Sequence, residues 1–94
     1  MLWFWVKSNM QYVYVIKSES GKMYTGRTSD LKRRLGEHQS GKNHTTKRMG
    51  KIKLIFYEAF LSKEDSIRRE RYLKTSSGKK SLKLIIRESI MQSE

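Results

Sequence analysis

The first third of the chain contains two short stretches with strand-forming residues, separated by turn residues, a pattern typical of a β-hairpin. Residues 11–18, QYVYVIKS, are rich in β-branched and aromatic side chains. The turn-forming stretch ESGK follows, and MYTGRT then resumes the pattern, which predicts a β-hairpin over residues 11–27. Because alternate side chains share one face of a strand, Tyr12, Tyr14 and Ile16 belong to one face of the first strand, and Tyr24 and Gly26 to one face of the second.

A helix is expected after the hairpin, over DLKRRLGEHQS up to Gly41, with Ser29 or Thr28 as its N-cap and Asp30 in its first turn. The next stretch, GKNHTTKRMGK, is polar, basic and flanked by glycine, and it predicts a loop. IKLIFYEAF at residues 52–60 then has the composition of a well-buried third strand.

The C-terminal third predicts two more helices. Ser62 and Asp65 resemble a capping box for a helix over residues 63–74, and TSSGKK is expected to break that helix. Leu82, Ile85, Ile86 and Ile90 then recur at helical spacing and predict a closing helix. The order β-β-α-β-α-α indicates an α+β fold, a small three-stranded antiparallel sheet flanked by helices.

Polar residues of the first helix border its apolar side. Successive helical residues advance by about 100°, so Arg34 and His38 flank the stripe formed by Leu31 and Leu35. Lys32, Arg33 and Glu37 are expected on the far, solvated side. A histidine in such a place is often only a packing residue. Gly36, which weakens a helix by about 1 kcal/mol relative to alanine, indicates either a close approach by another backbone or ligand, or a tolerated chance occurrence.

The stretch SIRRERYLK places a single acid, Glu70, among several cations. Helical spacing puts Glu70 between Ile67 and Leu73, on the apolar side, whereas Arg68 and Arg69 are expected to point to solvent. A carboxylate on an inward-facing stripe must be paired, hydrogen-bonded or bound to a metal. One interpretation is an ion pair with Lys74, four residues on, which contributes about 0.3–0.5 kcal/mol; the other is a functional role.

Charge narrows the class of partner. The 94 residues contain 21 Lys plus Arg against 9 Asp plus Glu, a net charge of +12, which favours a polyanion such as nucleic acid over a membrane surface. The chain has no cysteine, which is consistent with a reducing cytoplasm. Residues 1–10 are apolar only from Leu2 to Val6, too short for a membrane span. We expect a soluble cytoplasmic protein with one domain over residues 11–90. Residues 1–10 are expected to be an N-terminal extension, and an added strand used for dimerisation is the alternative.

Several motifs together resemble the GIY-YIG endonuclease domain, in particular its small bacterial stand-alone members. They are YVY at residues 12–14, YTG at 24–26, Arg34, His38, and Glu70 in RRERYLK. The resemblance covers roughly residues 11–88 and implies three antiparallel strands flanked by helices. Tyr12 replaces the usual first-motif glycine, and neither Asn9 nor Asn43 is placed to supply the asparagine that this family usually has near its C-terminal end.

The resemblance implies metal-dependent hydrolysis of DNA phosphodiester bonds. Glu70 would hold one Mg²⁺ or Mn²⁺ ion, and Arg34 would bind the scissile phosphate. Tyr24 would orient or deprotonate the attacking water, with Tyr14 in support and His38 positioning water or phosphate. Because a free phenol, with a pKa of about 10, is a poor base at neutral pH, cations such as Arg27 would have to favour the phenolate.

Further cations are predicted to contact DNA phosphates without reading sequence; they are Lys42, Lys47, Arg48, Lys51, Lys53, Lys79, Lys80 and Lys83. A solvated basic surface is the alternative for each of them. The expected partner is DNA, including branched or damaged DNA, and RNA is left open. We expect no association with a membrane, and a protein that is a monomer or a weak homodimer. The competing function is a noncatalytic nucleic-acid-binding module on the same fold, which the missing asparagine favours.

Overall fold

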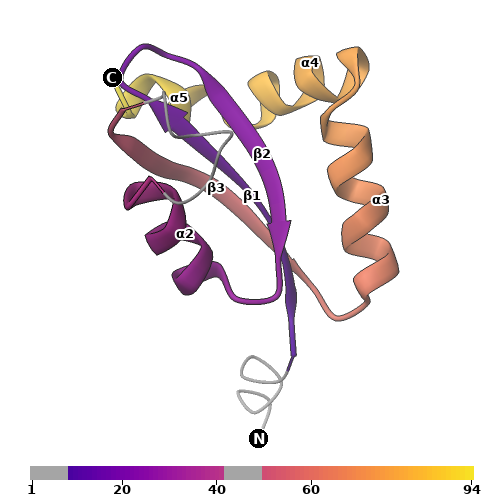
Figure 1. Ribbon diagram of the computed structural model, residues 1–94. Coiled ribbons are helices and arrows are strands. Elements are labelled where there is room, and N and C mark those ends of the chain that lie inside the picture. Colours follow the sequence, from indigo (N-terminus) through magenta and orange to yellow (C-terminus); the bar gives the residue numbers. More distant parts are fainter. Residues whose placement is uncertain (1–8, 42–49) are drawn as a thin grey trace, which may run out of the picture.

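The computed structural model describes residues 9–41 and 50–94, and its path is shown in Figure 1. The chain forms an α+β fold in which three strands and four helices are described; the elements are β1 (Gln11–Ser18), β2 (Met23–Thr28), α2 (Leu31–Gln39), β3 (Ile52–Phe60), α3 (Lys63–Leu73), α4 (Ser76–Ile85) and α5 (Arg87–Gln92). The expected N-terminal extension and the predicted phosphate contacts Lys42, Lys47 and Arg48 lie largely or wholly outside the described residues.

The three strands form one antiparallel sheet in the order β2-β1-β3, which confirms the predicted sheet and hairpin. The hairpin closes between Ser18 and Lys22, whose backbone groups bond at 2.9 Å. Gly21 adopts a φ of 92° in this turn, a conformation that side chains with a Cβ rarely take. The register pairs Tyr14 with Gly26 and Ile16 with Tyr24, so these four positions share one face of the sheet.

The central strand β1 is the most deeply buried part of the sheet. Val13, Tyr14, Val15 and Ile16 are all fully buried, because neighbouring strands cover both edges and helices cover both faces. The prediction that β3 is well buried is wrong. Its residues are half-buried or exposed, since β3 is an edge strand.

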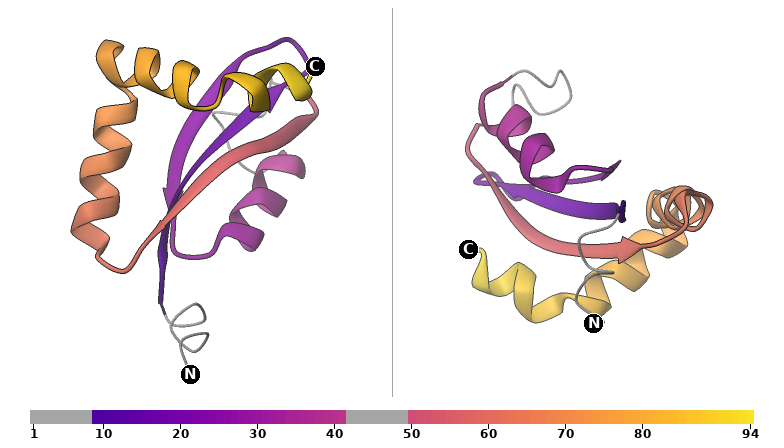
Figure 2. Two further views of the ribbon diagram at one scale, coloured as in Figure 1. Left: turned by 180° about the vertical axis from the view of Figure 1, so that it is seen from behind. Right: turned by 90° about the horizontal axis from the view of Figure 1, so that it is seen from below.

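Helices lie on both faces of the sheet, with α2 on one side and α4 and α5 on the other (Figure 2). Val13 and Val15 point to the second side, where they pack with Leu73, Leu82 and Ile86. Tyr14 points to the opposite side and meets α2. The two sides of β1 thus differ in character, since one builds the apolar core and the other presents polar aromatic groups.

The helix N-termini differ in how well they were predicted. Asp30, and neither Ser29 nor Thr28, is the N-cap of α2, and its carboxylate accepts a bond from the Arg33 backbone N–H at 3.1 Å. Thr28 instead supports the cap, since its hydroxyl accepts the Asp30 N–H at 3.0 Å. Ser62 caps α3 as predicted, through a bond from the Asp65 N–H.

The C-terminal segment forms two helices where one was predicted. TSSGKK does separate α3 from the C-terminal segment, but Thr75 caps a new helix there and residues 76–80 are its first turns. Ile86, at φ −113° and ψ 31°, separates α4 from α5. Leu82 and Ile86 are buried as expected, whereas Ile85 is 58% exposed. No helix in the described part of the chain has the length and apolar character needed to cross a bilayer.

Candidate active site

Tyr14 is the buried centre of a polar cluster between β1 and α2. Its phenol oxygen lies 2.7 Å from Nε2 of His38. Burial raises the pKa of Tyr14, and a hydrogen bond from the Arg34 guanidinium opposes that shift. Arg34 is a pure donor, so the phenol oxygen accepts from it, and the phenol and the His38 ring nitrogen share a second hydrogen bond whose direction is set by the His38 tautomer. Tyr14 therefore acts as a neutral link between the two side chains of α2.

Gly26 of β2 lies opposite Tyr14, where the tyrosine ring leaves no room for a larger residue. A Cβ built on Gly26 would lie 2.6 Å from Cζ of Tyr14 and closer still to the phenol oxygen. The Tyr14 ring therefore lies across the β2 backbone and occupies the space that a side chain would need. The glycine of YTG is a steric requirement for the position of this tyrosine.

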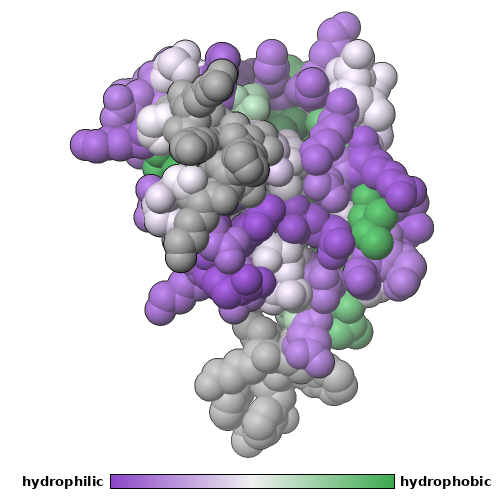
Figure 3. Space-filling view, viewed as in Figure 1, coloured by the Kyte–Doolittle hydropathy of each residue, from purple (hydrophilic) through white to green (hydrophobic). Residues whose placement is uncertain are grey.

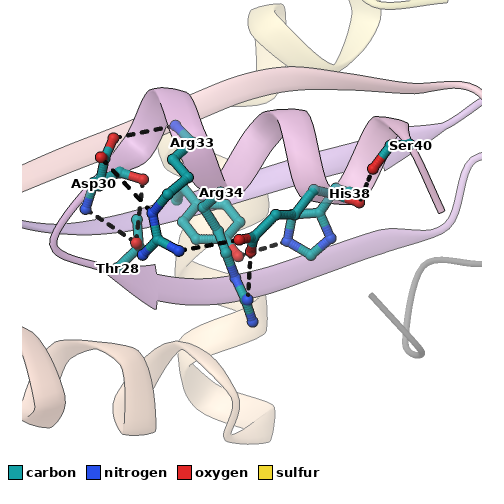
Figure 4. Close-up of polar contacts among 8 residues, drawn as sticks. Thr28, Asp30, Arg33, Arg34, His38 and Ser40 are labelled. Carbon is teal, nitrogen blue, oxygen red and sulfur yellow. Dashed lines mark hydrogen bonds and ion pairs between the residues drawn. The ribbon is translucent and has the colours of Figure 1, made fainter. Parts of the chain in front are cut away.

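His38 is almost fully buried on the inner side of α2, where helical spacing predicted it. Burial lowers its pKa, the positive charge of Arg34 lowers it further, and Glu37 partly opposes both effects. The neutral imidazole is therefore favoured, with its Nε2 hydrogen-bonded to the Tyr14 phenol. Figure 4 shows Arg34 and His38 projecting from the same helix, with Thr28 and Asp30 at its N-terminus and Ser40 at its C-terminus.

Arg34 is held by a carboxylate that the helical spacing placed wrongly. Its Nη1 donates to Glu37 at 3.0 Å, and Glu37 also accepts from Arg33 at 3.0 Å. Glu37 was expected on the solvated side, but it is partly buried because it lies three residues after Arg34 and one turn along the same side. Bonding to Tyr14 and Glu37 raises the pKa of Arg34. Its Nε is buried without a hydrogen-bond partner in the described structure.

Tyr24 connects this cluster to α3. Its ring centroid lies 5.5 Å from that of His38 and 6.5 Å from that of Tyr14. On the other side, the Lys74 ammonium lies 5.8 Å from the Tyr24 ring centroid. Lys74 is the ion-pair partner of Glu70, so the second tyrosine lies between the arginine–histidine side and the acid.

Glu70 faces inward and is paired with cations from two elements. One carboxylate oxygen lies 3.0 Å from Nζ of Lys74, which is the simple i,i+4 pair considered from sequence. The other oxygen lies 3.9 Å from Nε of Arg27 on β2. The Glu70 side chain is 22% exposed, and its charge tends to raise the pKa of Tyr14. The acid is therefore electrostatically part of the tyrosine cluster as well as of an ion pair.

The two arginines that were expected to point to solvent behave differently. Arg68 is 73% exposed, as predicted. The prediction for Arg69 is wrong: its guanidinium makes two hydrogen bonds to Glu58 of β3, at 2.8 and 3.1 Å. This pair ties α3 to the sheet and leaves Glu70 as the inward acid beside the tyrosines.

Gly36, the mid-helix glycine, has open space around it. A Cβ there would meet nothing within 4 Å outside its own helix. Of the two alternatives considered for Gly36, the close approach of another backbone is therefore not found within the described residues, and packing does not explain the glycine.

A divalent metal fits Glu70 as a single oxygen ligand. In residues 9–41 and 50–94, no group of three or more histidine, cysteine and carboxylate side chains gathers as a metal centre. Mg²⁺ and Mn²⁺ accept oxygen donors, and Mg²⁺ retains several waters with one or two carboxylates. The Glu70 oxygen that lies beyond hydrogen-bond distance of Arg27 is a suitable donor, and the half-exposed Lys74 side chain occupies the other oxygen.

The predicted phosphate contacts that the structure describes lie apart from this cluster. Lys51 and Lys53 are exposed and border a hollow with the hairpin turn and the C-terminal residues. Lys79 and Lys83 border another hollow with Met23, and Lys80 is exposed on the same helix. The cations adjacent to Arg27 and Arg34 are instead Arg33 and Lys63, which the sequence pattern did not single out. The face that carries α2, β2 and α3 is predominantly hydrophilic (Figure 3).

Comparison with known proteins shows the family of this chain. The profile of the GIY-YIG catalytic domain matches residues 10–83, so this chain belongs to the GIY-YIG family, whose domains are generally nucleases that use a divalent metal. Within it, the chain is similar to the UPF0213 proteins. One from Staphylococcus saprophyticus is 36% identical over 75 residues, 79% of this chain and 92% of the relative. One from Clostridium perfringens is 34% identical over 84 residues, 88% and 90% of the two chains.

A solved structure supports the fold as well. The solution NMR structure of a UPF0213 protein from Bacillus halodurans is 35% identical, with a TM-score of 0.53 over 81% of this chain and 84% of that one. The predicted three-stranded antiparallel α+β fold and the GIY-YIG resemblance are thereby confirmed. The UPF0213 names carry no particular activity, so these similarities establish the family and the fold.

Proposed function

We propose that this protein is an endonuclease that hydrolyses DNA phosphodiester bonds with one Mg²⁺ or Mn²⁺ ion. The observation that carries the proposal is the convergence of three elements on one polar cluster. Tyr14 and Tyr24 come from the hairpin, Arg34 and His38 from α2, and Glu70 from α3. A purely structural cluster does not need a donor-only guanidinium, two phenols and an inward acid at one place.

Each side chain has a role that its surroundings support. Glu70 would hold the metal ion, which as a Lewis acid would stabilise charge on the phosphoryl and leaving oxygens. Arg34 would bind the scissile phosphate with its planar donor fork, which Glu37 and Tyr14 hold in place. The buried, unpartnered Nε of Arg34 is a donor that a phosphate oxygen can satisfy.

The two tyrosines and His38 would organise the attacking water. Tyr24 is the tyrosine beside Lys74 and is only partly buried, so we assign it the contact with water. Tyr14 is fully buried and has a raised pKa, which suits a neutral supporting hydrogen bond rather than a base. His38 fixes Tyr14 from the other side, and Arg27 places a positive charge next to Glu70.

The test is nicking of supercoiled plasmid and of branched DNA by the purified protein with Mg²⁺, Mn²⁺ or excess EDTA. Metal-dependent nicking is expected, and Glu70→Ala and Arg34→Ala should each reduce it by at least about 100-fold, as for removal of a key charge-stabilising group. Arg68→Ala is the matched control, because this exposed arginine lies on the same helix as Glu70 but pairs with Asp65. Equal nicking by wild type and Glu70→Ala would refute the proposal.

The competing function is a nucleic-acid-binding module without activity. The ion pair of Lys74 with Glu70 favours this function, because the ammonium occupies one oxygen of the only inward acid described on α3. The missing C-terminal asparagine also favours it. This alternative is supported if the wild type binds DNA in a salt-dependent manner but never nicks it with either metal. Binding and nicking must therefore be measured on the same preparation.

A further inference from the structure

A basic pocket of about 380 Å³ lies next to the candidate active site. It is formed by the beginning of β1, the end of β2, the turn into α2 and the first residue of α3. Its lining residues are Gln11, Arg27, Thr28, Ser29, Arg33, Arg34 and Lys63. Since a water molecule takes up about 30 Å³ in the liquid, the pocket has room for a phosphate group and accompanying water.

The lining chemistry is that of an anion site. Four of its seven residues are cationic and none is acidic. Lys63 is exposed, and no carboxylate in the described part of the chain lies within ion-pair distance of it. Gln11 accepts from Arg27 at 3.1 Å through its amide oxygen, so its two N–H donors remain for a ligand.

The basic pocket is continuous with the active-site cluster through two shared arginines. Arg27 bonds Gln11 on the pocket side and lies 3.9 Å from Glu70 on the other. Arg34 lines the pocket and also bonds Tyr14. Two acids outside the pocket lining neutralise part of this charge. Glu37 accepts from Arg33 and Arg34, and an Asp30 oxygen lies 3.8 Å from Nε of Arg33.

We propose that the basic pocket binds a second phosphate of the nucleic-acid strand, next to the phosphate that the proposed endonuclease cleaves. The inference rests on the proposed function only in that the strand passes through the active-site cluster. Lys63 supplies a point charge and Arg33 a planar fork, while Ser29 and Gln11 add neutral hydrogen bonds. Because phosphates carry no base identity, the pocket positions the strand without selecting sequence.

The first test measures binding of a single-stranded oligonucleotide in EDTA, where metal-dependent cleavage does not interfere. Fluorescence anisotropy is recorded over a range of salt concentrations. Lys63→Ala should make the negative slope of log K against log salt less steep by about 0.7, the value for one contact to a single strand. Lys22→Ala, which removes an exposed lysine at the hairpin turn, should leave the slope unchanged. Equal slopes for Lys63→Ala and the wild type would overturn the proposal.

The second test locates the phosphate. Oligonucleotides each carry one uncharged methylphosphonate at a different position. The wild type should lose affinity, up to about five-fold, at the position that the pocket binds, and Lys63→Ala should lose less at that position alone. Identical profiles for the two proteins would contradict the inference.

The two proposals fail in distinguishable ways. A wild type that never nicks DNA, but shows the Lys63-dependent methylphosphonate effect, refutes the nuclease and retains the pocket. A wild type that nicks DNA while Lys63→Ala matches Lys22→Ala in every binding measurement refutes the pocket and retains the nuclease.

Discussion

Replacing Gly26 by alanine tests whether this glycine exists to seat Tyr14. The new Cβ would lie 2.6 Å from Cζ of Tyr14, well inside van der Waals contact, and that ring is fully buried. Overpacking of this kind costs about 1–3 kcal/mol. If the ring moves, the bond to His38 is also lost, at about 1 kcal/mol. We expect Gly26→Ala to lower the free energy of unfolding by about 2–4 kcal/mol.

Gly36→Ala is the matched control, because the same substitution meets open space there. Nothing lies within 4 Å of the added Cβ outside the helix itself, and alanine is favoured over glycine in helices by about 1 kcal/mol. We therefore expect a gain in unfolding free energy of up to about 1 kcal/mol.

The assay for both is urea denaturation followed by circular dichroism, with NMR of the His38 imidazole to report its bond to Tyr14. Gly26→Ala should destabilise the protein and shift the His38 signals, and Gly36→Ala should do neither. A Gly26→Ala protein as stable as the wild type, with unchanged His38 signals, would refute the steric argument.

Three further outcomes are expected from single contacts. Tyr14→Phe removes the hydrogen bond between the phenol and Nε2 of buried His38, so urea titration should show a loss of about 1–3 kcal/mol. An unchanged midpoint would contradict this. Arg69→Ala breaks the two bonds to Glu58 and should cost about 1 kcal/mol, against less than about 0.5 for exposed Arg68→Ala; equal losses would count against it. The lowered pKa of His38 means that the unfolded chain binds a proton that the folded protein does not, so the free energy of unfolding should fall as pH drops through about 6.5. His38→Gln cannot titrate and should show a smaller fall. An equal fall in this variant would exclude His38 as the cause.

Local patterns were sufficient for most elements of the fold. The β-branched and aromatic residues on either side of ESGK predicted the hairpin over residues 11–27, and the Ser62 cap predicted the start of α3. The burial of β3 was misjudged because it depends on strand order, which composition does not reveal. Asp30 replaced its neighbours as the cap of α2 because three adjacent residues were all competent, and only the path of the turn chooses between them.

Spacing within a helix was enough to predict which side chains of the candidate site face inward, whereas contacts between elements needed the family resemblance or the structure. The inward positions of Arg34 and His38 follow from helical spacing. The Arg69–Glu58 pair and the contact of Lys63 with the arginine-lined pocket join elements distant in the chain, so no local signal marks them. The contact of Glu37 with Arg34 could have been predicted from sequence, because residues three apart in a helix lie close enough to form an ion pair.

The proposed endonuclease activity depends most on whether Glu70 is a metal ligand or only an ion-pair partner. A crystal of the protein soaked with Mn²⁺, in the presence of a cleavage-resistant oligonucleotide, answers it directly through the anomalous signal of manganese. If Glu70 is the metal ligand, an anomalous peak is expected at its carboxylate, with the Lys74 ammonium moved off it. An intact Glu70–Lys74 pair with no anomalous peak beside it would rule out the one-metal endonuclease and leave a DNA-binding module.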